Sequence, residues 1–132
     1  MSLELLLPVN NEAILGLSML PKQVIGKNID IHTEESGLPE LKGLQIAIVG
    51  LVEQRNSFFA NAQYDVNQFR REFYELYPGN WKLKIADLGD LSNGEKVKDT
   101  YFAIKEIGFH LKQMNIVPVF IGGSHDLIFP LY

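Results

Sequence analysis

The sequence predicts an α/β protein in which a parallel sheet lies between helices. Three short apolar runs, at 44–52, 81–90 and 116–123, alternate with two amphipathic stretches, at 64–77 and 95–115. Strands that alternate with helices of this length are joined by crossover connections, so the strands are parallel and the helices cover the faces of the sheet. We therefore expect a three-layer αβα arrangement, with ligands bound at the carboxyl ends of the strands.

The first strand and the helix after it have the clearest patterns. Residues 44–52, LQIAIVGLV, are a continuous apolar run rich in β-branched side chains, which is typical of a strand buried on both faces. Apolar residues recur at helical spacing over 64–77, and Pro78-Gly79 ends the predicted helix. The predicted apolar stripe of this helix comprises Val66, Phe69, Phe73, Leu76 and Tyr77.

A weaker strand, a strong helix and a third strand follow. In residues 81–90, Leu83 and Ile85 alternate with lysines, a mixed pattern that predicts a strand at the edge of the sheet. Asp87 is interpreted as a loop or capping residue. Residues 116–123, IVPVFIGG, predict the third strand. The helix between these strands, at 95–115, has the predicted stripe Val97, Tyr101, Ile104, Ile107 (or Gly108) and Leu111.

Residues 1–43 differ from the rest of the chain because prolines and glycines interrupt every periodic pattern. A short helix is expected at 11–20, capped by Asn10 or Asn11. We interpret residues 1–43 as an N-terminal arm that wraps the α/β domain of residues 44–132; the alternative is a disordered leader.

The composition excludes several classes of protein. The 132 residues fit one domain, and 46% of them are hydrophobic, which is enough for a core. The net charge of −4 argues against a nucleic-acid partner, which requires basic patches. No run is long enough to span a membrane, and cysteine is absent, which excludes disulfides and thiolate chemistry. Without a signal peptide, a cytoplasmic location is expected.

A glycine pair and a histidine follow the third strand. Gly122 and Gly123 allow a sharp structural turn, after which His125 can project into the crevice at the carboxyl end of the strand. A neutral imidazole is a common ligand of transition metals. Asp126 could orient the ring or contact the metal indirectly, and Ser124 could cap a following helix.

An exposed histidine with no functional role is the alternative interpretation of this motif. No second histidine lies at helical or strand spacing from His125, and His32 and His110 lie in other parts of the sequence. Asp87 and Asp90 follow the second strand. If that strand lies two places from the third, the separation is about 10 Å, too far for these carboxylates to share one metal with His125.

These motifs together resemble the ureohydrolases, the family of arginase, agmatinase and formimidoylglutamase. That family has Gly-Gly-Asp-His-Ser after its third strand, and this sequence has Gly-Gly-Ser-His-Asp. IAIVGL is similar to its first strand, FRREFYEL to the next helix, KIADLGDL to its second strand and VPVFIGG to its third. The resemblance covers residues 44–132, is closest to the formimidoylglutamase-like branch, and implies the N-terminal part of an arginase-like fold.

The resemblance implies a binuclear Mn²⁺ site that activates a bridging water for attack on an amidine or guanidinium carbon. His125 would be one metal ligand. The exchange of Ser124 and Asp126 relative to the family leaves the role of the usual aspartate open. Arg55 or Asn56, in the loop after the first strand, could contact a substrate carboxylate, although a solvated loop is the favoured alternative.

The Asp-x-His-x-Asp and Asp-x-Asp motifs that hold the family's other metal ligands do not occur in this sequence. We therefore expect an N-terminal fragment of a hydrolase that is inactive alone, with a small amidine or guanidino substrate in the full-length protein. The open third strand predicts a homo-oligomer or strand-edge pairing. The main alternative is a small non-catalytic α/β binding or regulatory module. A nucleotide-binding half-domain is disfavoured because no glycine-rich phosphate loop is present.

Overall fold

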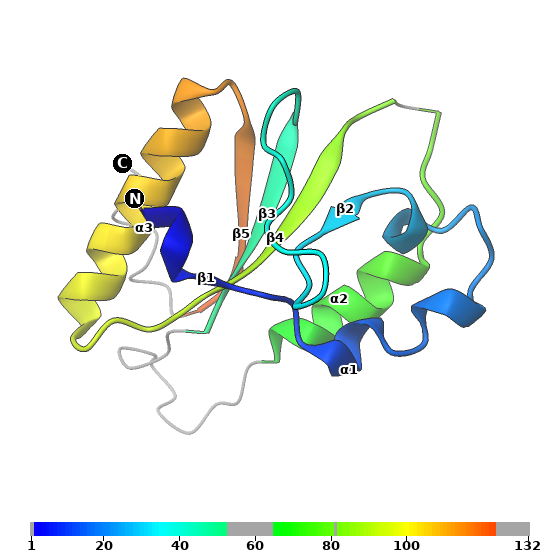
Figure 1. The fold of residues 1–132 in the computed structure, drawn as a ribbon, viewed down its shortest axis with the longest axis horizontal. Coiled ribbons are helices and arrows are strands. Elements are labelled where there is room, and N and C mark those ends of the chain that lie inside the picture. The colour runs from blue at the N-terminus through cyan, green and yellow to red at the C-terminus, as the bar shows by residue number, and fades with distance from the viewer. Residues whose placement is uncertain (1, 53–64, 81, 124–132) are drawn as a thin grey trace.

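Three parallel strands form the centre of the protein. The structure, a computed structural model, describes residues 2–52, 65–80 and 82–123. Strand β3 (Ile46–Leu51) lies in the middle, between β4 (Ile85–Leu91) and β5 (Val117–Gly122), and pairs in parallel with both (Figure 1). The predicted β-α-β-α-β order and its parallel strands are confirmed, as is the separation of the second and third predicted strands by two places.

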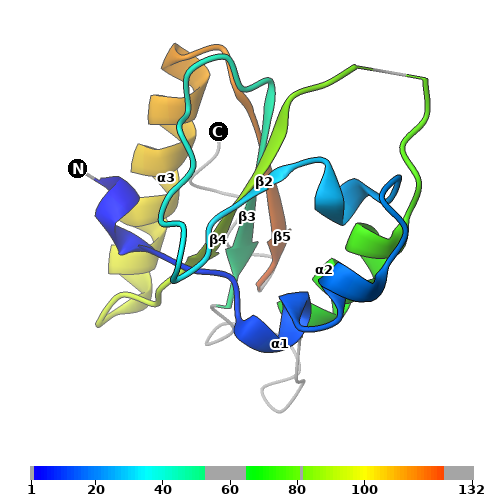
Figure 2. The same ribbon diagram turned by 45° about the vertical axis from the view of Figure 1, so that its right-hand side comes forward.

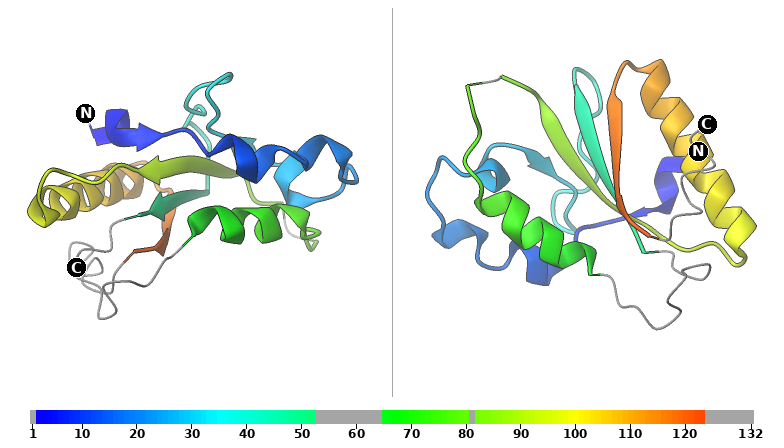
Figure 3. Two further views of the ribbon diagram at one scale, coloured as in Figure 1. Left: turned by 90° about the horizontal axis from the view of Figure 1, so that it is seen from below. Right: turned by 180° about the vertical axis from the view of Figure 1, so that it is seen from behind.

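The two long helices pack on opposite faces of this sheet. Alternate residues of β3 divide between the faces: Ala47 and Val49 join the apolar cluster formed with α3 (Val97–Gln113), whereas Gly50 faces α2 (Val66–Glu75). Figure 3 shows the two helices on either side of the strands. The protein is therefore an α/β protein whose sheet has helices on both faces.

The N-terminal arm adds two short strands to the outer edge of β4. Leu6–Leu7 (β1) pairs antiparallel with Asp90 and Leu91, whereas Asp30–Ile31 (β2) pairs in parallel with Ala86 and Asp87. The sheet is consequently mixed rather than purely parallel. The prediction that the second strand lies at the edge was wrong, because β4 is flanked on both sides and almost wholly buried.

The rest of the arm is short helical turns that cross the edge of the sheet. It comprises the 3₁₀ turns η1 (Ser2–Leu5), η2 (Leu17–Met19) and η3 (Ile25–Lys27) and the helix α1 (Asn11–Ile14). Asn10 caps α1 as predicted, because its side chain accepts a hydrogen bond from the Glu12 amide at 2.8 Å. The arm runs from α3, which η1 contacts, to α2, which α1 and η3 contact (Figure 2).

The apolar stripe of α3 was predicted well, and that of α2 was not. Ile104, Ile107 and Leu111 are buried in the core under α3. In α2, by contrast, the buried residues are Val66, Arg70 and Tyr74, which are four residues apart. The predicted stripe residues Phe69 and Phe73 are half-buried and stacked on each other, with ring centroids 5.4 Å apart. Leu76 and Tyr77 lie beyond the helix and are exposed.

A β-bulge interrupts the pairing of β3 with β4. Ile48 pairs with Asp87 and Gly50 with Asp90, so the single residue Val49 is opposed by two residues, Leu88 and Gly89. Gly89 has φ = 91°, a conformation that favours glycine. The extra residue shifts the strand's alternation, so that the side chains of Asp87 and Asp90 both point towards α2 instead of to opposite faces.

Replacement of Gly89 by alanine is expected to destabilise the protein by more than the same change at Gly37. Both glycines have positive φ, of 91° and 75°. A Cβ at Gly89 would collide with the Leu7 carbonyl of β1, whereas nothing lies within 4 Å of one at Gly37. Gly37→Ala should cost about 1 kcal/mol of unfolding free energy from backbone strain alone, and Gly89→Ala at least about 2 kcal/mol. Equal losses in urea denaturation would contradict a close contact between β1 and the bulge.

Within the described residues, no helix is both long enough and apolar enough to cross a membrane.

Candidate functional site: a buried charge cluster at the β4 bulge

Arg70 of α2 joins the two aspartates that the bulge brings to one face. Its Nε and Nη2 atoms donate to the two carboxylate oxygens of Asp87 at 2.8 and 3.1 Å, which is a bidentate pair. Its Nη1 atom donates to Oδ1 of Asp90 at 2.7 Å. The side chains of Arg70 and Asp87 are fully buried. One guanidinium therefore neutralises part of the charge of two carboxylates inside the protein.

Asp87 uses both of its oxygens for hydrogen bonds within the protein. Oδ2 accepts from Arg70 Nε and, at 2.6 Å, from the Tyr74 hydroxyl. Oδ1 accepts from Arg70 Nη2 and, at 3.0 Å, from the Gly89 amide. Four donors leave no oxygen free for a metal or substrate. The interpretation of Asp87 as a loop or capping residue was wrong, because it lies inside β4 and organises the bulge around itself.

Burial and charge act together on the ionisation of this cluster. Burial lowers the pKa of Arg70, but its hydrogen bonds to Asp87 and the negative charges of Asp87 and Asp90 outweigh that effect, and the pKa is raised. Burial raises the pKa of Tyr74, and the charge of Asp87 raises it further. The arginine stays charged and the tyrosine stays neutral over the whole physiological range. Neither Arg70 nor Tyr74 is therefore suited to transfer a proton in this pH range.

Asp90 is the member of the cluster that reaches the surface. Its side chain is 16% exposed and lies next to the carboxyl end of β4. A hollow of about 440 Å³ at this end is lined by Asp90, by Glu34 and by residues of the arm between Leu7 and Asn11. The hollow has carboxylate and amide oxygens on its wall, which could contact a cationic ligand or ordered water.

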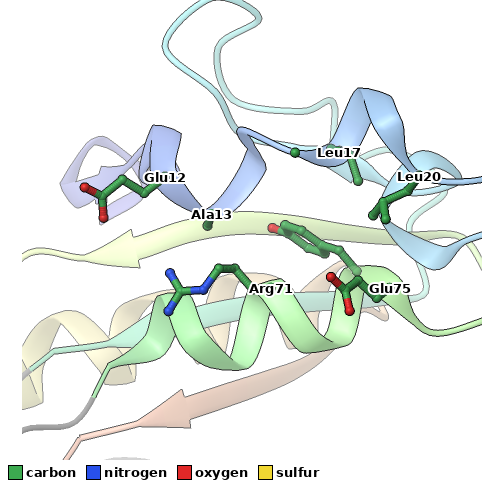
Figure 4. Close-up of a pocket in the computed structure, with 8 residues that line it drawn as sticks. Glu12, Ala13, Leu17, Leu20, Arg71 and Glu75 are labelled. Carbon is green, nitrogen blue, oxygen red and sulfur yellow. The ribbon is translucent and has the colours of Figure 1, made fainter.

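A second, smaller hollow lies between the arm and α2 (Figure 4). It has a volume of about 120 Å³. Arg71 and Glu75 line it from α2, and Glu12 and Ala13 from α1. Tyr74 also lines it, so this hollow approaches the hydroxyl that binds Asp87. Its charged residues are exposed on the helix surface, and we assign it no role.

Of the site residues predicted from the sequence, the structure describes only the two glycines. Gly122 has φ = 93° and ends β5, where it pairs with Leu51 of β3, and Gly123 has φ = 79°. Both conformations favour glycine and turn the chain at the carboxyl end of the sheet. Ser124, His125, Asp126, Arg55 and Asn56 lie outside the described residues.

His32 and His110 are the two histidines that the structure describes. His32 is buried, and its Nδ1 atom lies 2.9 Å from the Leu88 carbonyl oxygen, within hydrogen-bonding distance. His110 is half-buried on α3. In the part of the chain that the structure describes, no group of three or more histidine, aspartate or glutamate side chains could hold a metal ion.

Arg70, Tyr74 and the shared orientation of Asp87 and Asp90 were not predicted from the sequence. Two signals in the sequence could have revealed them. Arg70 lies four residues after Val66 and four before Tyr74, a helical row that places a charge on the buried face. An isolated glycine inside a strand pattern, here Gly89, is a typical sign of a bulge.

Comparison of the chain with protein-family models, with curated proteins and with solved structures finds no match.

Removal of the Arg70 charge should destabilise the protein far more than removal of its neighbour. Arg70→Met leaves two carboxylates unpaired, one of them fully buried, and should cost about 3–5 kcal/mol of unfolding free energy. Arg71→Met is the matched control, because Arg71 pairs with Asp65 at 3.4 Å on the surface and should cost less than about 1 kcal/mol. Urea denaturation at neutral pH measures both. Similar losses in the two variants would show that the buried cluster does not stabilise the fold.

Tyr74→Phe should reveal the raised pKa of Tyr74 as a pH dependence. The variant loses a hydrogen bond to a charged acceptor, which costs about 1.5–3 kcal/mol at neutral pH. Above about pH 10 the unfolded wild type releases the Tyr74 proton while the folded protein keeps it, so wild-type stability falls as pH rises above the unfolded pKa of Tyr74. The phenylalanine variant lacks this proton. The stability difference between the two proteins should therefore shrink above about pH 10; a constant difference in urea titrations from neutral to alkaline pH would contradict the assignment.

Proposed function

We propose that the chain forms part of a manganese-dependent hydrolase that acts on linear amidine or guanidino C–N bonds, of the formimidoylglutamate, arginine or agmatine type. The observation that carries the proposal is the turn at Gly122 and Gly123. Gly122 is the last residue of β5, beside β3 at the carboxyl end of parallel strands, and only Ser124 separates this pair of positive-φ glycines from His125 in the sequence. Ligands of α/β proteins bind at this end of the sheet.

The strand order supports the proposal at the level of the fold. In the ureohydrolase resemblance the first strand lies beside the third, and β3 lies beside β5. Helices on both faces of the sheet are compatible with a three-layer αβα fold. We propose an arginase-like arrangement for residues 44–132, with residues 1–43 as an added arm whose strands cover β4.

The described residues do not fit a manganese site by themselves. Asp87 uses both oxygens for four hydrogen bonds, and Asp90 is paired with Arg70. Mn²⁺ prefers several carboxylate ligands beside an imidazole. His125 is proposed as one ligand, with Asp126 or Ser124 in a supporting role, and further carboxylates would have to come from other residues. Arg55 and Asn56 remain candidates for contact with a substrate carboxylate.

The alternative, a complete binding module without a metal, has less support. It requires the third strand of the βαβαβ unit to be covered by the protein itself. The arm instead covers β4, and β5 has no strand on its outer side in the described part of the chain.

A titration with Mn²⁺, followed by electron paramagnetic resonance, tests the role of His125. The chain should bind weakly, with a dissociation constant above about 1 μM, because one imidazole and few carboxylates are available. His125→Ala should abolish this binding, whereas His110→Ala on α3 should not change it. An unchanged titration in His125→Ala contradicts the ligand assignment. Binding below about 1 μM, or release of ammonia or formamide from formimidoylglutamate above the uncatalysed rate, contradicts the proposal that the site is incomplete in this chain.

A further inference from the structure

The sequence contains a single asparagine that is followed by glycine, Asn93. Asn93 and Gly94 lie in the connection between β4 and α3 (Figure 1), where Asn93 is exposed and Gly94 is half-buried. Asparagine is thermolabile because the backbone nitrogen of the next residue can attack its side-chain amide. Glycine hinders this attack least, since it has no side chain. The covalent chemistry of the chain therefore singles out Asn93.

The packing of this connection against α3 requires the glycine. A Cβ at Gly94 would collide with the Cβ of Asp99 and would lie 3.0 Å from the backbone nitrogen of Thr100, both near the start of the helix. The main chain thus approaches α3 too closely to accept a side chain at this position. A bulkier residue that would hinder the attack on Asn93 cannot replace Gly94 without a shift of the connection.

Thr100 holds the nitrogen atom that would make the attack. The Gly94 amide donates a hydrogen bond of 2.9 Å to Oγ1 of Thr100, a residue that is 1% exposed. The attack requires removal of the amide proton, and a base cannot reach a proton that is held in a buried hydrogen bond. Hydrogen exchange of such amides is slow for the same reason and proceeds through local opening. Attack on Asn93 should therefore also require an opening that separates Gly94 from Thr100.

The residues on either side of Asn93 are anchored to different elements. The Ser92 amide and hydroxyl both donate to the Leu5 carbonyl of the arm, at 3.2 and 3.1 Å. Gly94 is held by α3 through Thr100. Asn93 consequently lies in the main chain between two anchors, at the point where the arm, the end of β4 and the start of α3 meet.

We propose that Asn93 is a site of spontaneous deamidation and that the hydrogen bond from Gly94 to Thr100 sets its rate. In the first step the Gly94 nitrogen forms a bond to Cγ of Asn93, the bond from Cγ to Nδ2 breaks, and ammonia leaves with the proton of the Gly94 amide. Water then opens the cyclic imide at either carbonyl and leaves aspartate or isoaspartate at position 93. The reaction consumes only water.

The products should weaken the contact that delays their formation. Isoaspartate lengthens the main chain by one methylene group between the anchors at Ser92 and Gly94, so the Gly94 amide is displaced from Thr100. Both products add one negative charge to the net charge of −4. Deamidation therefore converts a transient opening of this connection into a permanent one. The inference does not depend on the proposed hydrolase function.

Incubation of the folded protein at mildly alkaline pH, followed by anion exchange and peptide mass mapping, tests the site. The peptide that contains Asn93 should be modified, and modification should be slower in buffer than in urea, where Thr100 no longer protects Gly94. Asn28 is the internal control, because its side chain donates to the Lys22 and Val24 carbonyls and the next residue is not glycine. Equal rates in buffer and urea, or earlier modification of Asn28, overturn the proposal.

Two variants of Thr100 test its role. Thr100→Val removes the acceptor and should accelerate deamidation by about fivefold, as expected for the loss of one hydrogen bond. Thr100→Ser keeps a hydroxyl and should retain the wild-type rate. Circular dichroism establishes that each variant is folded. An unchanged rate in folded Thr100→Val, or equal acceleration in Thr100→Ser, overturns the assignment to Thr100.

A measurement on the wild type tests the same role without a substitution. Hydrogen exchange gives the factor by which folding protects the Gly94 amide. Because attack on Asn93 requires the same opening, folding should slow deamidation by at least this factor relative to the rate in urea. A smaller effect of folding on deamidation than on exchange contradicts control by the hydrogen bond between Gly94 and Thr100.

Discussion

The structure depends on the salt bridges that Arg70 makes to Asp87 and Asp90 across a bulged strand. Two aspartates three residues apart in a regular strand would point to opposite faces. The bulge at Gly89 returns both to the α2 face, and only then can a single arginine reach them. The elements around the cluster pack closely against it. The Leu7 carbonyl of β1 lies close to Gly89, and η3 packs against Tyr74.

The cluster also limits what this end of the sheet can do chemically. Carboxylates near the carboxyl ends of parallel strands are obvious candidates for metal ligands, and Asp87 and Asp90 lie in this part of β4. Asp87 is nevertheless saturated by four hydrogen bonds, and Asp90 shares the same guanidinium. The aspartates therefore act as a scaffold for the rim, and any metal chemistry must depend on residues beyond Gly123 or on other segments.

The alternation of strands and helices could be predicted because burial on two faces leaves a long continuous pattern, as in residues 44–52 and in α3. The prediction failed at β4 and at α2, where the local sequence pattern is misleading. Strand β4 looked like an edge because lysines precede it, but the ordered strand begins at Ile85, after those lysines. Arg70 was not included in the predicted stripe of α2, because arginine is seldom buried. Its two partners face α2 together only because of the bulge at Gly89. The two glycines at the end of β5, Gly122 and Gly123, were identified from their sequence context, whereas the remaining predicted site residues lie outside the described residues.

The arm contacts both long helices and the sheet that lies between them. Its first turn packs against α3, its two short strands close the side of β4, and its later turns hold the end of α2, where the Ile25 amide donates to the Leu76 carbonyl at 2.7 Å. A strap of this kind ties both helical layers to the sheet. Neither layer can open fully until the strap detaches, so amide hydrogen exchange in α2 and α3 should proceed through one common opening event and not through separate local ones.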